Sequence, residues 1–373
     1  MTIKYIFWND NTGYGTSGKQ IIRALTRAGI KVIPVGLEHN TKLSAEYQLP
    51  KSIDPTIPYD IVFIHSAPYY IARLIEPGKI NIAYCTWETS ILPQKWCAVL
   101  NQCSAIFVPS TFNRHCFEQS GVNKPIMLLP HISEFSGISK TSENNYANHR
   151  PFTFYSVGMW TNRKNYLELI RTFKSAFHQG ENVQLVIKTS KKDYTRPAYY
   201  FLRKLGFSRF NFLKDIKNVQ SEVKNDPRII IHTEDWPAES MIDLHRQSDC
   251  YISLCKSEGW GLGAYEAAWY GKPVIITGYG GQLDFLKAEV ATLLPYTLVN
   301  INEKVWTEYN TENQQWADVN IDASIKSMQL AYKHPVDFQN QGLKLKQHLE
   351  LKFNERLIID TFIQELSAFN VKP

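Results

Sequence analysis

The sequence predicts an α/β protein with two domains, each built on a doubly wound parallel sheet. Short apolar runs alternate with helical and loop stretches along both halves of the chain. This alternation is typical of parallel strands that are buried on both faces. The chain has 373 residues, of which 44% are hydrophobic, and this is ample for two hydrophobic cores.

The first domain is predicted to occupy residues 1–140 and begins with a βαβ unit. Residues 3–8 form an apolar strand, 9–15 a polar, glycine-rich loop, 18–28 an amphipathic helix and 31–36 a second strand. Four further apolar runs complete a parallel sheet: residues 61–64, 80–84, 105–108 and 126–129.

The second domain is predicted over residues 151–341, after a polar linker without periodicity at 137–150. Residues 342–369 repeat apolar side chains at the spacing of one long helix. We expect the segment 342–373 to pack back towards the first domain. The strands of the second sheet are expected at residues 152–157, 183–187, 228–231, 250–254 and 273–276.

Charge and hydropathy indicate which ligands and which cellular location suit this sequence. The net charge of +6 suits anionic small molecules or an acidic membrane surface, and no nucleic-acid-binding module is present. No apolar run is long enough for a membrane span or a signal peptide, so we expect a cytoplasmic protein. Residues 191–217 carry eight basic and two acidic side chains among aromatic ones. They are either a solvated face or a peripheral contact with anionic lipid on the inner face of the cell membrane.

A glycine-rich run at residues 13–18 has the spacing G-x-G-x-x-G between a strand and a helix. Glycine lets backbone amides approach an anion at a helix N-terminus, so Gly13, Tyr14 and Gly15 are candidates for a phosphate loop. With Glu38 further along, the run also suits dinucleotide binding. It falls one residue short of a nucleoside-triphosphatase loop and lacks that loop's magnesium-binding hydroxyl. A third interpretation is that the run forms a tight turn and binds no ligand.

A second glycine-rich stretch, residues 257–276, is the most informative part of the sequence. After the strand 250–254 it forms a loop, then a helix at 264–270, then the next strand. The loop is expected to direct backbone amides at a ligand above the sheet. Its ligand-facing candidates are Gly259, Trp260, Gly261 and Leu262.

Two carboxylates flank this predicted anion site. Glu258 lies in the loop, and Glu266 is expected in the first turn of the helix, where the helix dipole stabilises a negative charge. Carboxylates accept hydrogen bonds from vicinal hydroxyls of a sugar or ribose, while amides hold a diphosphate. Gly280 and Gly281, before a predicted helix at 282–286, offer a second set of amides. A surface glutamate and a capping glutamate are the plainer alternative.

The stretch 257–276 resembles the E-x(7)-E motif of the family-four retaining glycosyltransferases. The resemblance implies a GT-B fold and an enzyme that moves a sugar from a nucleotide-diphosphate-sugar donor to a glycan or lipid-linked acceptor. It also implies a role in surface polysaccharide or glycolipid synthesis. The resemblance extends to four other stretches: residues 13–18, 108–112, 129–131 and 158–165.

In the family that the chain resembles, the donor lies mainly on the second domain. The resemblance implies that Glu258 contacts the donor sugar, Glu266 the ribose and Lys164 the diphosphate. No cofactor or metal is expected, because the sequence has neither a D-x-D triplet nor a histidine cluster with metal-ligand spacing. The acceptor is expected to attack from the face of the leaving group.

The sequence departs from the family pattern at two places. An arginine usual after the first glycine of the second domain is absent, so Arg163 or Lys188 would replace it. The catalytic histidine of the first domain is also absent, and Glu88 or His65 would replace it. Two other functions remain open: a dinucleotide-dependent oxidoreductase or epimerase, and an inactive sugar-nucleotide-binding scaffold.

Overall fold

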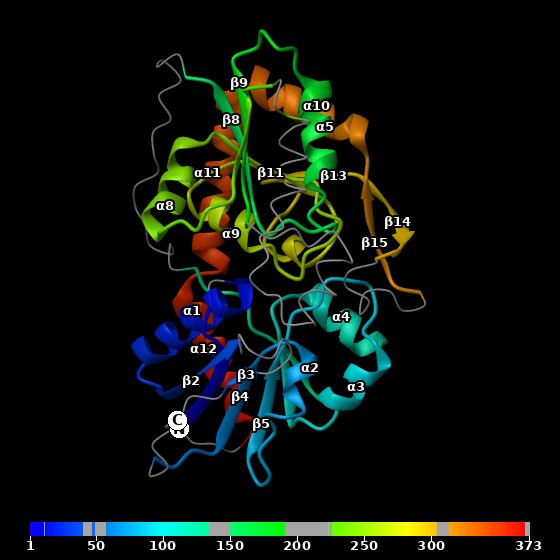
Figure 1. Ribbon diagram of the computed structural model, residues 1–373. Coiled ribbons are helices and arrows are strands. Elements are labelled where there is room, and N and C mark those ends of the chain that lie inside the picture. Colours follow the sequence, from blue (N-terminus) through cyan, green and yellow to red (C-terminus); the bar gives the residue numbers. More distant parts are fainter. Residues whose placement is uncertain are drawn as a thin grey trace. The chain divides into compact units, whose positions relative to one another are not determined.

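The computed structural model describes residues 1–10, 12–39, 47–48, 57–133, 150–190, 223, 226–303 and 313–369. The chain divides into two compact units (Figure 1). Unit 1 comprises Met1–Ser136 and Lys352–Pro373, and unit 2 comprises Gly137–Leu351. The predicted linker up to residue 149 and the basic segment 191–217 lie outside the described residues.

Unit 1 is built on a seven-stranded sheet with the strand order β3-β2-β1-β4-β5-β6-β7. All neighbouring strands are parallel except β2 and β3. Helices α1 and α12 contribute side chains to the same core, against one face of this sheet (Figure 1). The elements are β1 Thr2–Trp8, α1 Gly13–Arg27, β2 Lys31–His39, β3 Tyr47–Gln48, β4 Ile61–His65, α2 Pro68–Ile71, β5 Ile80–Tyr84, α3 Gln94–Leu100, β6 Ala105–Val108, α4 Thr111–Gln119, β7 Ile126–Leu128 and α12 Glu355–Ser367.

Helix α1 begins at Gly13, so the prediction of a loop over residues 9–15 and a helix from residue 18 is wrong at this boundary. Thr12 caps the helix, and its side chain accepts from the Gly15 amide. A Cβ atom at Gly15 would lie 2.3 Å from the Asp10 carbonyl oxygen, and one at Gly18 would lie 3.0 Å from Phe7. These glycines let α1 approach β1, so the spacing of the run needs no ligand to explain it.

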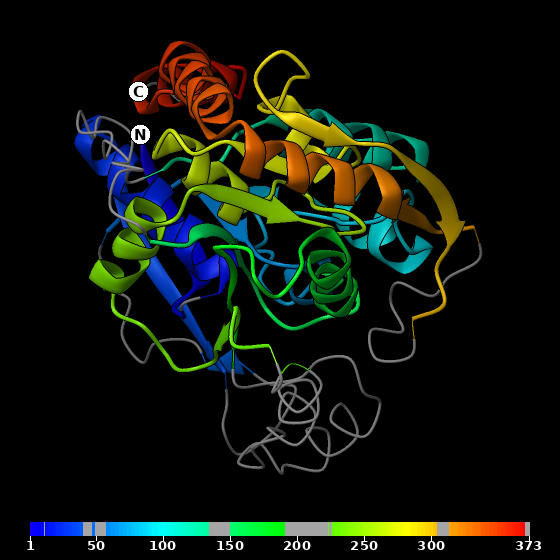
Figure 2. The same cartoon turned by 90° about the horizontal axis from the view of Figure 1, so that it is seen from above.

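Unit 2 is built on a six-stranded parallel sheet with the order β10-β9-β8-β11-β12-β13. An antiparallel hairpin, β14 with β15, leads into α10 (Figure 2). The elements are β8 Phe152–Val157, α5 Tyr166–Ala176, β9 Val183–Lys188, β10 Ile229–His232, α8 Ala238–Gln247, β11 Cys250–Ser253, α9 Leu262–Trp269, β12 Val274–Thr277, the 3₁₀ helix Gly281–Asp284, β13 Thr292–Leu294, β14 Tyr296–Asn300, β15 Gln315–Val319, α10 Ile321–Lys333 and α11 Pro335–Lys352.

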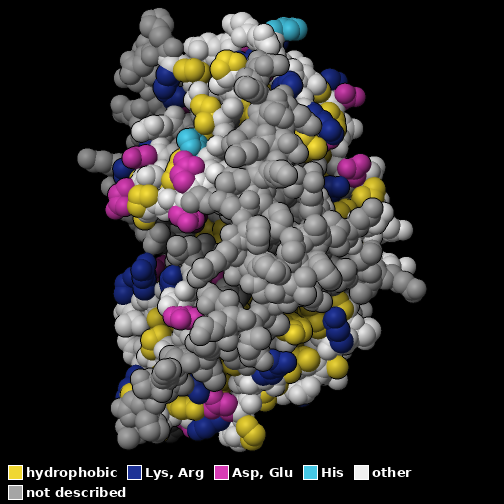
Figure 3. Space-filling model, in the orientation of Figure 1, with side chains coloured by type: hydrophobic (Ala, Val, Ile, Leu, Met, Phe, Trp, Pro, Cys, Tyr) yellow, Lys and Arg dark blue, Asp and Glu magenta, His cyan; other side chains and the backbone are white. Residues whose placement is uncertain are grey.

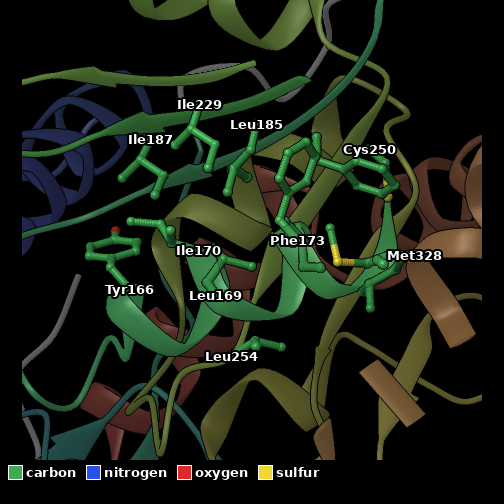
Figure 4. Close-up of a cluster of buried hydrophobic side chains, with 14 of the residues drawn as sticks. Tyr166, Leu169, Ile170, Phe173, Leu185, Ile187, Ile229, Cys250, Leu254 and Met328 are labelled. Atoms are coloured by element: carbon green, nitrogen blue, oxygen red, sulfur yellow. The ribbon is translucent and has the colours of Figure 1, made fainter. Parts of the chain in front are cut away.

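The core of unit 2 shows why α5 forms where it does. Its apolar residues recur at helical spacing, so that Tyr166, Leu169, Ile170 and Phe173 share one buried stripe. In Figure 4 this stripe faces residues of β9 and β10, among them Leu185, Ile187 and Ile229. The two parallel sheets and their helices confirm the predicted fold class.

The predicted helix 342–369 is two helices, and this expectation is corrected. The chain turns at Asn354, whose side chain accepts from the Leu357 amide and caps α12. Helix α11 packs on unit 2, where Gly342 lies against the backbone of residues 271–273. Helix α12 instead completes the core of unit 1, where the Phe362 ring meets Phe63 edge-on at 5.5 Å.

Charged and hydrophobic side chains are interspersed over the described residues of the face in Figure 3. No helix in the described part of the chain combines the length and the apolar character that are needed to cross a membrane.

Gly342→Ala is expected to destabilise unit 2 although the residue is helical. The new Cβ atom would lie 2.3 Å from the Gly271 carbonyl oxygen and 2.6 Å from the Pro273 nitrogen. Both are backbone atoms, so α11 would have to move, at a cost of about 2 kcal/mol. Urea unfolding measures the loss, with Gly180→Ala as the control, because a Cβ atom there meets nothing within 4 Å. Equal stability of the two variants would contradict the close packing of α11.

Candidate active site

The glycine loop of unit 2 connects β11 to α9 at the carboxyl edge of the sheet. Gly261 precedes the first residue of α9 with φ +90°, a left-handed conformation that favours glycine. Helix α9 begins at Leu262, two residues earlier than expected. Glu266 therefore lies in the second turn of α9 and not in the first, and the predicted position is corrected.

Two cationic side chains contact Glu258, a residue of this loop. Glu258 Oε1 lies 2.6 Å from Lys164 Nζ, and Glu258 Oε2 lies 3.0 Å from Arg163 Nη1. The side chains are only 8% (Glu258), 10% (Arg163) and 14% (Lys164) exposed. Burial by itself would raise the pKa of Glu258, but Lys164 and Arg163 outweigh it and hold that pKa below its ordinary value. The cluster thus carries one negative and two positive charges.

The loop between β8 and α5 presents both cations. Asn165 has a left-handed conformation, with φ 56°, directly before α5. A Cβ atom at Gly158 would lie 2.9 Å from Lys164 Cε, so glycine at this position leaves room for the lysine side chain. The Lys256 amide donates to the Arg163 carbonyl oxygen at 2.8 Å and ties this loop to the glycine loop.

Of the two cations that the sequence offers for the absent arginine, Arg163 joins the Glu258 cluster. Its guanidinium also donates to the Ser257 carbonyl oxygen at 2.6 Å. Lys188 lies at the end of β9, where it donates to the Thr189 carbonyl oxygen at 2.9 Å and sits over the Trp236 ring at 5.3 Å. Lys188 therefore contacts a different group of residues from Arg163.

The second glycine stretch packs directly on the first. The Gly281 amide donates to the Glu258 carbonyl oxygen at 2.7 Å. Gly280 has φ +116°, and a Cβ atom there would lie 2.7 Å from the same oxygen. The predicted helix 282–286 is instead the short 3₁₀ helix Gly281–Asp284. Trp260 is 2% exposed and packs on Phe285 at 5.0 Å, so it anchors the loop in the core.

Glu266 lies on α9 and contacts a buried histidine. Its Oε2 atom lies 3.6 Å from His245 Nε2, and its side chain is 18% exposed. His245 is fully buried, and its Nδ1 atom lies 2.8 Å from the Tyr155 hydroxyl. The sequence analysis missed His245. The signal that could have found it is a polar side chain on the inward face of a helix that ends just before the buried strand β11.

The candidates in unit 1 fall into a buried polar network. The Tyr14 hydroxyl donates to the Thr86 carbonyl oxygen at 3.0 Å, and the Thr86 amide donates back at 3.1 Å. His65 is fully buried, with Nδ1 2.9 Å from the Tyr5 hydroxyl. Burial and then His131 lower the pKa of His65 well below its ordinary value. His65 is therefore neutral, and no hydrogen bond from the described residues reaches its Nε2 atom.

The remaining unit 1 candidates differ in exposure. Glu88 is half-buried in the loop after β5, and Gly13 is exposed at the start of α1. His131 ends the stretch 129–131, which shares the family resemblance, but it was not among the predicted site residues. Its Nδ1 atom is in hydrogen-bond contact with Ser17 and lies 3.4 Å from the Tyr84 hydroxyl. Over the described residues, no group of three or more histidine, cysteine, aspartate or glutamate side chains is placed to hold a metal ion.

The segment that holds the Glu258 cluster is similar to a known protein family. Residues 138–297 match the family model described as "Glycosyl transferases group 1". The match agrees with the resemblance that residues 257–276 suggested. No curated protein sequence matches the chain.

Solved structures share the two-unit fold of this chain at low sequence identity. Alr3699/HepE from Anabaena, in complex with UDP and glucose, has 10% identity and a TM-score of 0.63, with 99% of this chain and 100% of that chain covered. Sucrose-phosphate synthase from Thermosynechococcus elongatus has 13% identity and a TM-score of 0.67, with 99% of each chain covered. These likenesses confirm the GT-B fold.

The match to a larger protein is partial. TarM of S. aureus, in complex with fondaparinux, α-GlcNAc-glycerol and UDP, has 11% identity and a TM-score of 0.57. The similar region covers 82% of this chain and 54% of TarM, so the chain spans about half of that protein's length.

Proposed function

We propose that the protein is a retaining glycosyltransferase that uses a nucleotide-diphosphate-sugar donor without a metal ion. The observation that carries the proposal is the convergence of Lys164 and Arg163 on the buried carboxylate of Glu258, between two loops shaped by glycine. A donor's diphosphate would lie against the two cations and the backbone amides of these loops.

The proposed chemistry depends on the charge that develops on the leaving phosphate. When the bond between the anomeric carbon and the β-phosphate oxygen breaks, its electron pair stays on the phosphate. The ammonium of Lys164 and the guanidinium of Arg163 stabilise that charge, and their attraction is strong because the site is largely buried. Since Glu258 holds both cations in place before the donor arrives, little reorganisation is needed.

Retention of configuration requires the acceptor to approach from the face that the phosphate leaves. The acceptor hydroxyl forms the new bond to the anomeric carbon, and its proton passes to an oxygen of the leaving phosphate. Glu258 accepts hydrogen bonds from hydroxyls of the donor sugar, and Glu266 accepts them from the ribose. In unit 1, Glu88 is the better candidate for an acceptor contact, because His65 is fully buried.

The acceptor is proposed to be a glycan or a lipid-linked glycan, which suits synthesis of a surface polysaccharide or glycolipid by a cytoplasmic enzyme. Two of the similar structures, TarM and Alr3699/HepE, are complexes with UDP. We therefore place UDP-sugars first among the donors to be tested. Contact of residues 191–217 with an anionic membrane belongs to the same proposal.

Isothermal titration of the full chain tests the donor site. UDP, GDP, ADP and NADH are titrated with EDTA present, and we expect micromolar binding of one nucleoside diphosphate. Glu266→Ala is expected to weaken that binding about tenfold, because it removes a charged acceptor of hydrogen bonds. Binding of NADH alone would instead support the oxidoreductase alternative. If the protein binds a nucleoside diphosphate tightly but does not cleave the corresponding nucleotide sugar, the scaffold alternative is favoured.

The stereochemical outcome is a separate test. Proton NMR of the first product formed from an α-linked donor should show an α-anomer. A β-anomer would contradict retention while leaving the donor site intact.

A further inference from the structure

A chain of three polar side chains runs from the core of unit 2 to the donor side of α9. The Tyr155 hydroxyl lies 2.8 Å from His245 Nδ1, and His245 Nε2 lies 3.6 Å from Glu266 Oε2. Tyr155 and His245 are fully buried, whereas the Glu266 side chain is 18% exposed. Glu266 is thus the one member of this chain that can reach a ligand.

The imidazole ring of His245 is fixed by aromatic contacts as well as by the hydrogen bond. Tyr270, the residue that ends α9, stacks on it with a centroid distance of 5.0 Å and an interplanar angle of 2°. The Tyr155 ring meets it edge-on at 5.5 Å and 80°. Because the ring cannot turn without losing these contacts, its Nε2 atom points to a defined place beside α9.

The position of the imidazole hydrogen follows from the neighbours. An ionised carboxylate only accepts hydrogen bonds, so the nitrogen that faces Glu266 carries the hydrogen. Nδ1 then accepts a hydrogen bond from the Tyr155 hydroxyl. Burial and the neighbouring Tyr251 raise the pKa of Tyr155 well above its ordinary value, so the phenol keeps its hydrogen. The 3.6 Å separation from Glu266 is an electrostatic contact rather than a hydrogen bond.

We propose that His245, oriented by Tyr155, is a positioning residue that fixes the Glu266 carboxylate to receive the hydroxyls of the donor's ribose. Selectivity for ribonucleotides over deoxyribonucleotides then depends on a histidine that does not itself touch the ligand. This inference rests on the proposed function, which assigns Glu266 to the donor. It adds the residue that orients the carboxylate and the substrate class that the orientation selects.

The variants are chosen so that the core stays packed. Tyr155→Phe combined with His245→Phe removes both polar partners, leaves no buried polar atom of the pair unmatched and keeps an aromatic ring against Tyr270. Tyr155→Phe alone keeps the histidine and removes only the group that orients it. This single variant serves if the double variant fails to fold.

The readout is a ratio of dissociation constants, which general destabilisation of the fold would not change. The nucleoside diphosphate that binds best among UDP, GDP and ADP is titrated beside its 2′-deoxy counterpart. We expect the wild type to prefer the ribonucleotide about 10- to 100-fold, and the double variant to prefer it less than about threefold. The dissociation constant of the deoxy compound should differ less than about twofold between the wild type and the double variant. Tyr155→Phe should lower the wild-type ratio by about threefold.

Glu266→Ala separates the two possible failures. If Glu266→Ala abolishes the preference while both Tyr155→Phe and the double variant retain it, the role of His245 is overturned and the donor assignment stands. If Glu266→Ala leaves the preference intact, or if the wild type binds none of the diphosphates, the proposed function fails and this inference fails with it.

Discussion

Lys164→Met is expected to lower the turnover of sugar transfer by about 10²- to 10³-fold. Lys164 Nζ lies 2.6 Å from Glu258 in the cluster where the leaving phosphate is proposed to bind. Methionine keeps the length of the side chain and removes the charge that stabilises the transition state, and loss of one such group costs about this factor. Release of nucleoside diphosphate from the donor, with water as acceptor, measures the effect before the natural acceptor is known.

Lys188→Met is the matched control for this prediction. Lys188 is also half-buried and follows a strand of the same sheet, but it contacts Trp236 and Thr189 rather than Glu258. We expect it to change turnover less than about threefold. A larger loss from Lys188→Met than from Lys164→Met would move the diphosphate site to the end of β9.

Glu258→Gln is expected to separate binding from turnover. Without the carboxylate, the buried cations of Arg163 and Lys164 lose their negatively charged partner, which costs about 3 kcal/mol in the free protein. A bound nucleoside diphosphate restores the missing negative charge. The ligand should therefore raise the melting temperature of the variant more than that of the wild type, while turnover falls at least about 100-fold.

The contribution of Glu258 to the stability of the fold is expected to decrease as the pH falls. Because the folded protein holds the pKa of Glu258 below its ordinary value of 4.5, the ion pairs stabilise the fold above that pH. They are lost as the pH falls through the lower, folded pKa. Glu258→Gln should remove this acid-sensitive contribution. Glu289→Gln, at an exposed glutamate of the same unit, is the control and should change neither the stability nor the turnover. Equal ligand-induced shifts in the two variants would contradict the proposed contact between the diphosphate and the cations.

The sequence predicted the two sheets well because buried parallel strands are continuous apolar runs. The predicted strand 61–64 and the observed Ile61–His65 differ by one residue, and β12 begins one residue after its predicted start. Periodicity could not locate the break between α11 and α12, since apolar spacing continues across it. The decisive signal there is Asn354, a capping residue inside an otherwise helical pattern.

The candidate site was predicted in part. The spacing of Glu258 and Glu266 identified the glycine loop, but not the partner of either carboxylate. That Arg163 rather than Lys188 joins Glu258 depends on the left-handed turn at Asn165, which no apolar pattern encodes. At the glycines of residues 13–18, the sequence pattern instead suggested a ligand that is not needed to explain them. Gly15 and Gly18 have the spacing of a ligand loop, yet close packing of a helix on a strand accounts for both.

The nested order of the two units along the chain has a consequence for biosynthesis. Unit 2 is one continuous segment, Gly137–Leu351, whereas unit 1 needs both ends of the chain. The core of unit 1 stays incomplete until Ile358, Ile359 and Phe362 of α12 have been synthesised. Since domains fold as units while the ribosome is still translating, unit 2 can fold first, before the last helix of unit 1 has been synthesised. A premature stop near residue 351 would then leave unit 2 folded and expose the apolar face of the unit 1 sheet that α12 covers.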